Sequence, residues 1–152
     1  MRAHSTAVLV LLSLGLLLPP LAAHAQQQQE QRVKVQVEVV LVSNKDNTVD
    51  PPELAQMKET FRKQNINFNS FKRLSLETVE VGTQKSTEVR LPNGVTASLK
   101  LVATKESSST VHVEIPRQSS VDVELGRQGS VYQKVGKHVG GELILVLSPP
   151  AG

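Results

Sequence analysis

Apolar and polar residues alternate along much of this chain, and that period of two constrains its fold more than any other feature. From Val33 to Leu41, every second residue is a valine or leucine, with Lys34, Gln36 and Glu38 between them. Such alternation is typical of a strand with one face buried and one face in water. We therefore expect a β-rich domain whose first strand begins at Val33.

Turn signals divide the rest of the chain into further short strands. The segment Leu91–Val95 predicts a hairpin, because Pro92 and Asn93 suit the turn corners and Gly94 suits a left-handed position. Gly126–Gly129 predicts another turn, and the unbroken apolar run Leu143–Leu147 predicts a strand covered on both faces. The expected later strands are Phe71–Val81, Ser86–Leu91, Val95–Ala103, Thr110–Ile115, Val121–Leu125, Ser130–Val135 and Glu142–Ser148.

One segment has a helical pattern instead. Leu54, Met57 and Phe61 recur at the spacing of one helix face. Asp50 stands before two prolines, where its side chain is placed to cap the first turn. These features predict a short helix over Pro51–Gln64.

Together the elements predict an all-β fold, an antiparallel sandwich or barrel of about seven or eight short strands with one short helix. The alternative is an α+β fold in which the helix packs on one face of an antiparallel sheet. We expect a single domain at residues 33–148, preceded by a polar, disordered leader at residues 26–32 and followed by a tail at residues 149–152.

The first residues predict export. An apolar run from Ala7 to Leu18 ends at Pro19-Pro20, and Ala23-His24-Ala25 follows with the small side chains that signal peptidase accepts. The run is shorter than the ~20 residues that span a bilayer. Residues 1–25 are therefore expected to be a signal peptide, and the mature chain to begin at Gln26 in the periplasm or outside a bacterial cell.

Composition argues against several functions. The chain has no cysteine and no tryptophan, with only three phenylalanines and one tyrosine, so it offers few rings to stack on sugars or bases. Of 17 lysines and arginines, Arg2 falls in the expected signal peptide, which leaves 16 against 14 acidic residues. With positive and negative charges so nearly equal, the chain is not expected to bind a nucleic acid.

Strand register suggests one candidate metal site. If apolar residues of neighbouring strands all face inward, Lys100 lies opposite Glu114, His112 opposite Glu124, and Asp122 opposite both Glu114 and Lys134. Imidazole and carboxylates are suitable ligands for a divalent metal. Because the two lysines flank the acids, we expect a solvated charge ladder and no bound metal. The candidate ligands are His112, Glu114, Asp122 and Glu124.

Two other segments carry weaker signals. The loop Asn44–Asp50 has alternating oxygen ligands but lacks the glycine and the distal glutamate of a calcium loop. The stretch Gly126–Gly141 combines glycine turns with basic residues that could hold an anion, although tight turns explain the glycines equally well. Its candidate anion-binding residues are Arg127, Lys134, Lys137 and His138.

Neither a nucleophile motif nor a cofactor fingerprint is present, so no catalytic residue and no cofactor is assigned. We expect a non-catalytic exported β module that binds another macromolecule, such as an envelope protein or a surface component. The alternative is a small metal-dependent or hydrolytic enzyme that uses the cluster around His112.

Overall fold

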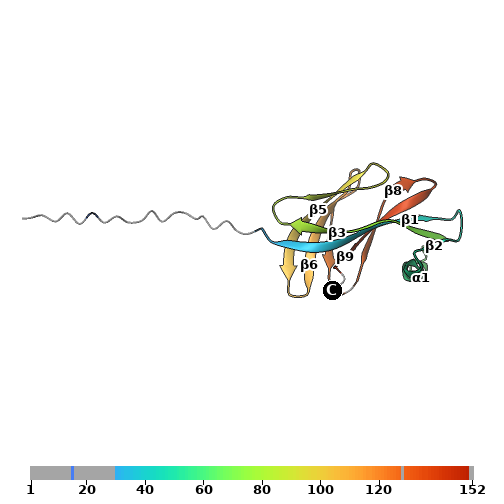
Figure 1. The fold of residues 1–152 in the computed structure, drawn as a ribbon, viewed down its shortest axis with the longest axis horizontal. Helices are drawn as coiled ribbons and strands as arrows, with labels where there is room; N and C mark the ends of the chain where they lie inside the picture. Colours follow the sequence, from blue (N-terminus) through green and yellow to red (C-terminus); the bar gives the residue numbers. More distant parts are fainter. Residues whose placement is uncertain (1–14, 16–29, 128, 151–152) are drawn as a thin grey trace, which may run out of the picture.

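The structure, a computed structural model, describes residues 15, 30–127 and 129–150. The predicted cleavage site at Ala25 and most of the predicted leader lie outside this part of the chain. Figure 1 shows a β sandwich with one helix, α1 (Ala55–Lys63), which follows a 3-10 turn, η1 (Pro52–Leu54). The strands are β1 (Arg32–Ser43), β2 (Val49–Asp50), β3 (Ser70–Gly82), β4 (Thr87–Arg90), β5 (Thr96–Lys105), β6 (Ser108–Glu114), β7 (Val121–Leu125), β8 (Val131–His138) and β9 (Gly141–Ser148).

The strands form two sheets packed face to face, so the predicted sandwich is confirmed. One sheet has the order β2-β3-β1-β9-β8 and the other β4-β5-β6-β7, and every pairing is antiparallel except β2–β3. The alternating valines and leucines meet between the sheets, where burial of apolar surface stabilises the fold. Buried members of this core include Val35, Val37, Val39, Leu99, Val111, Val113, Leu143, Leu145 and Leu147.

Strand β9 is buried on both faces, as its apolar run predicts. In Leu143–Leu147, the first, third and fifth side chains pack in the core between the sheets. Ile144 and Val146 instead belong to a second apolar cluster on the outer face of the five-stranded sheet. The helix covers this second cluster.

Helix α1 uses the face that the sequence predicts. Leu54, Met57 and Phe61 are all buried against the outer face of the five-stranded sheet. The Phe61 ring packs edge-on against two others, with centroids 5.7 Å from Phe71 and 5.2 Å from Tyr132. Such edge-to-face contacts fix the helix on the sheet.

The start of the helix differs from the prediction. Asp50 belongs to β2, where it pairs with Lys72, and no side chain caps the first turn, whose N-cap is Pro51. The predicted cap is wrong because the extended Pro51 separates Asp50 from the first helical residue. The α-helix itself begins only at Ala55, after η1.

Strand β3 changes the face that it buries. Val81 packs in the core between the sheets, whereas Phe71 packs on the outer face although both residues have odd numbers. The pairing with β1 jumps from Ser75 to Arg73 and leaves Leu74 as a bulge. An inserted residue of this kind reverses the alternation, so Arg73 points to the outer face.

The predicted hairpin at Gly94 is confirmed. Gly94 has a φ of 83°, and its N–H donates to the carbonyl of Leu91 at 3.0 Å. Leu91 N–H in turn donates to the carbonyl of Val95 at 2.8 Å, which closes the loop between β4 and β5.

The described part of the leader contacts the residues that follow β3. Arg32 already belongs to β1, so the strand starts one residue earlier than predicted. Glu30 Oε1 accepts hydrogen bonds from the N–H groups of Gln84 and Lys85 at 3.1 and 3.3 Å, next to the end of β3. Within the described residues, no helix combines the length and hydropathy that a membrane crossing requires.

Candidate functional site

The predicted register of the His112 cluster is wrong by two residues in both ladders. His112 faces Asp122 and not Glu124, and it is His112 rather than Glu114 that faces Lys100. Alternation fixes the face that a residue occupies but not its partner across the ladder. Consequently Glu124 lies farther along β7, while the other predicted ligands remain neighbours.

Lys134 was also expected beside Asp122, and this is wrong because the two residues belong to different sheets. Lys134 lies in β8 of the five-stranded sheet and pairs with Ile144. Its Nζ is 3.4 Å from Glu142 Oε2. The lysine therefore contributes to another part of the surface.

His112 is engaged at both ring nitrogens. Nδ1 is 2.6 Å from Asp122 Oδ1 and Nε2 is 3.2 Å from Glu114 Oε1. The hydrogen bond with Asp122, and then that with Glu114, raises the pKa of His112. A metal ligand needs a neutral ring with a free lone pair. Among the described residues, no group of three or more His, Cys, Asp or Glu side chains could hold a metal ion.

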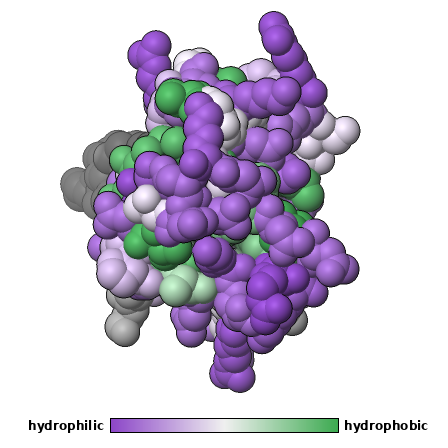
Figure 2. All heavy atoms as spheres, turned by 90° about the vertical axis from the view of Figure 1, so that its right-hand side faces the viewer, coloured by the Kyte–Doolittle hydropathy of each residue, from purple (hydrophilic) through white to green (hydrophobic). Residues whose placement is uncertain are grey.

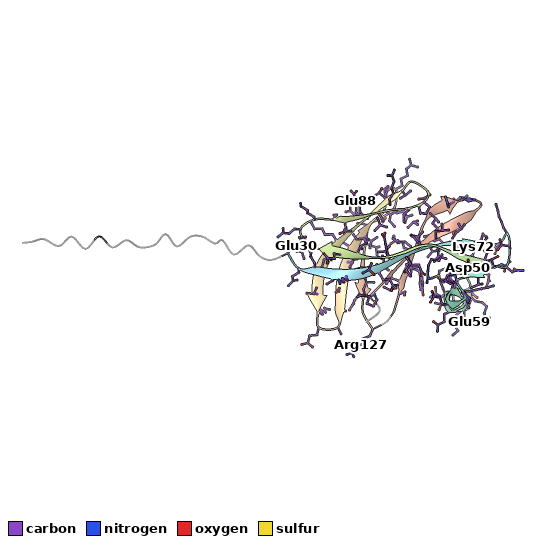
Figure 3. All side chains as sticks on the ribbon, in the orientation of Figure 1. Glu30, Asp50, Glu59, Lys72, Glu88 and Arg127 are labelled. Atoms are coloured by element: carbon purple, nitrogen blue, oxygen red, sulfur yellow. The ribbon has the colours of Figure 1, made fainter. Side chains whose placement is uncertain are left out.

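The predicted anion-binding residues lie at opposite ends of β8. Arg127 lies in the turn between β7 and β8, at the lower edge of Figure 3. Lys137 and His138 lie at the other end of β8. A strand of this length separates its ends by roughly 25 Å, so Arg127 lies apart from Lys137 and His138.

In the Asn44–Asp50 loop, the carboxylate of Asp46 binds other groups of the protein. Asp46 Oδ1 accepts the N–H of Thr48 at 3.0 Å, and Oδ2 is 3.1 Å from Lys72 Nζ. The hydrogen bond from the Thr48 N–H contributes most to lowering the pKa of Asp46, and the contact with Lys72 lowers it further. Lys72 and Asp50 lie near each other beside α1 in Figure 3. The carboxylate of Asp46 thus stabilises the loop and its link to β3.

A hollow that the sequence did not predict lies on the outer face of the five-stranded sheet. It has a volume of about 260 Å³ and is bounded by η1, the start of α1 and the outward side chains of β3, β1, β9 and β8. We call it the outer groove. Its lining residues are Gln36, Glu38, Glu53, Leu54, Gln56, Met57, Arg73, Leu76, Ser130, Tyr132, Val146 and Ser148.

A charged network lines the outer groove. Glu38 is only 8% exposed, and its Oε2 accepts from Arg73 Nε at 2.8 Å. Arg73 also lies 2.7 Å from Glu53 Oε1. Burial alone would lower the pKa of Arg73, but the hydrogen bonds with Glu53 and Glu38 outweigh it and raise that pKa. Two carboxylates and one guanidinium leave the network with a net charge of −1.

Polar and apolar groups alternate around the rest of the groove. The hydroxyls of Ser130 and Ser148 are 2.7 Å apart. Tyr132 is half-buried beside them, and its pKa is raised chiefly by that burial. Val146 and Met57 supply apolar surface. The groove can therefore hold an amphipathic segment, with several hydrogen-bonding groups to orient it.

The outer groove opens onto a free sheet edge. Strand β2 pairs with β3 only at Phe71 and Lys72. Beyond them, from Arg73 to Val79, β3 has no strand partner on that side within the described residues. Two leucines stand on this stretch with large exposed fractions, 40% for Leu74 and 42% for Leu76.

A larger hollow lies at the end of the molecule that carries the β8–β9 turn. We call it the tip hollow; its volume is about 720 Å³. Figure 2, which views the end that bears α1, shows mostly hydrophilic side chains with apolar atoms between them. The tip hollow is lined by Val42, Ser43, Asn44, Lys45, Phe68, Lys137, His138, Val139, Gly140, Gly141 and Glu142.

Sequence reasoning missed the outer groove because its charged residues occupy positions that predict exposure. Glu38 and Arg73 each occupy a polar position of an alternating strand, which predicts exposure to solvent. They meet only because the bulge at Leu74 turns Arg73 outward and η1 then covers them. The only sequence signal was the opposite charge of two residues 35 positions apart.

Comparisons with known proteins do not assign this chain to a family. No family model, no curated protein and no solved structure matches it.

Proposed function

We propose that this chain is a non-catalytic, exported β module that binds a partner protein of the cell envelope through the outer groove and the free edge of β3. The observation that carries the proposal is the juxtaposition of a hollow, a partly buried ion-pair network and two exposed leucines on an unpaired edge. Export is motivated separately by the Ala23-His24-Ala25 pattern.

An unpaired edge offers a direct way to bind an extended segment. Its free N–H and C=O groups can form main-chain hydrogen bonds with a strand of the partner. Leu76 points to the outer face, opposite Glu38 in the β1–β3 ladder, and therefore contributes a side-chain contact inside the groove. Main-chain bonds would supply affinity, and the groove would supply selectivity.

The charge of the groove indicates which partner side chains it favours. Arg73 contacts Glu38 at Oε2, through Nε at 2.8 Å and Nη2 at 2.7 Å, and not at Oε1. A lysine or arginine of the partner could complete this carboxylate and neutralise the net charge of −1. Its aliphatic stem would lie over Val146 and Tyr132, as long cationic side chains do on apolar surfaces.

The enzyme alternative receives no comparable support. A general base at His112 would need an unprotonated ring nitrogen within reach of a substrate. Both nitrogens instead contact carboxylates that favour the protonated ring. Binding therefore remains the function that we propose.

Capture of the mature protein from its own envelope extract tests the proposal. Leu76→Asp puts a charge in the groove and should abolish retention of the partner, whereas Val102→Asp, at a valine 53% exposed on β5, should not. Retention that survives Leu76→Asp, or that both variants lose, would refute the site. The intact mass of the same sample should correspond to a chain starting at Gln26.

A further inference from the structure

The turn between β8 and β9 has an unusual residue at its tip. His138 and Gly141 form the last pair of the ladder, so Val139 and Gly140 are the two turn residues. Both have positive φ, 45° for Val139 and 76° for Gly140. Asparagine or glycine normally fills the first of these positions, because a β-branched residue is strained there.

The valine is also highly exposed. Val139 has 72% of its surface accessible, the largest fraction among the exposed large hydrophobic residues that the structure describes. A turn selected for stability alone would carry neither the strain nor the apolar surface. Strained residues that persist in a fold often mark a functional contact, and here the contact would have to accept an apolar tip.

Positive charge surrounds this tip. Lys45 and Lys137 line the tip hollow together with His138. The Lys45 side chain lies so close to Gly140 that a side chain at that glycine would collide with its Nζ. The loop after β1, which carries Lys45, and the β8–β9 hairpin, which carries Lys137, thus present their amines on the same side of the molecule.

One carboxylate moderates that charge. Glu142 faces Lys137 across the β8–β9 ladder, and its Oε2 lies 3.4 Å from Lys134 Nζ. Three lysines and one glutamate leave a net charge of +2, with His138 counted as neutral. The neighbouring acid, Asp46, already contacts Lys72.

We propose that the β8–β9 tip and the tip hollow form a contact site for a membrane surface rich in anionic phospholipids. Lys45 and Lys137 would contact lipid phosphates while Val139 enters the boundary between headgroups and acyl chains. This combination of amines around an apolar protrusion is the chemistry that interfacial binding requires. A free phosphate would need the amines alone, and a neutral membrane would need the apolar tip alone.

Vesicle binding by the chain from Gln26 onward tests this site. We expect it to sediment with vesicles of equal parts phosphatidylglycerol and phosphatidylcholine, and not with phosphatidylcholine alone. Lys45→Gln and Lys137→Gln should each weaken binding about fivefold. Val139→Gly keeps every amine, relieves the turn and should still weaken binding. Val102→Gly and Lys100→Gln, on the four-stranded sheet, are the matched controls and should bind as the wild type does.

Three results would overturn the inference. The first is equal binding to both kinds of vesicle, and the second is unchanged binding by Val139→Gly. The third is displacement by inorganic phosphate at an ionic strength at which sodium chloride does not displace, since that would identify a site for free phosphate. None of these results affects the outer groove, so this inference and the proposed function stand or fall separately.

Discussion

His112 lies between two carboxylates on the exposed face of the four-stranded sheet, with Asp122 at one ring nitrogen and Glu114 at the other. Lys100 faces it across the ladder on the other side. When the imidazole is protonated, the row from β5 to β7 therefore carries two neighbouring positive charges, on Lys100 and His112, and one negative charge, on Asp122. The sequence predicted that these side chains share a face, but their exact partners depend on register.

The raised pKa of His112 predicts how stability changes with pH. A group whose pKa is higher in the folded state stabilises the fold fully below its unfolded pKa, and this stabilisation is lost as pH rises through the folded pKa. The melting temperature of the wild type, compared with that of His112→Gln, should therefore fall as the pH rises above the ordinary pKa of 6.5. An NMR titration that places the pKa of His112 at or below its ordinary 6.5 would contradict the geometry.

The same thermal unfolding experiments distinguish a charge ladder from a metal site at His112. Zinc or calcium added to chelator-treated protein should leave the melting temperature unchanged, because a metal bound at either ring nitrogen of His112 would have to displace the hydrogen bond that this nitrogen makes with a carboxylate. A rise of several degrees that Asp122→Asn abolishes would restore the metal-dependent alternative.

At the scale of elements, turns are the features that sequence predicts best. The Leu91–Val95 loop needs a left-handed residue at its fourth position, and Gly94 supplies it with a φ of 83°. A bulge gives no comparable signal. Leu74 is one residue of an alternating run, yet as a bulge it reverses which side chains of β3 face the core.

The hairpin at Gly94 yields a stability prediction. A Cβ at Gly94 would meet no heavy atom within 4 Å, so Gly94→Val should cost only the conformational strain of a β-branched residue, about 1–2 kcal/mol. Thermal unfolding should show a drop of roughly 4–8 °C. Gly94→Asn is the control and should lose less, because asparagine tolerates positive φ. Equal melting temperatures for the valine variant and the wild type would rule out the strained position.

At the scale of the whole molecule, the sandwich follows from alternation, turn spacing and the doubly buried β9. What alternation leaves undetermined is which strands share a sheet, since β7 and β8 are joined by a short turn yet belong to different sheets. It also does not place the helix. The outer groove and the tip hollow arise where α1 and the loops lie on the outer face, so neither hollow can be predicted from any single segment.

The central claim is that the free edge of β3 beside the outer groove contacts a partner protein. Its most direct test places a photo-crosslinking amino acid at position 76 in living cells, and at position 102 as the matched control. We expect one discrete adduct from position 76, lost when Arg73→Gln disrupts the network in the same chain, and none from position 102. Absence of any adduct at position 76, or the same adduct from both positions, would contradict the claim.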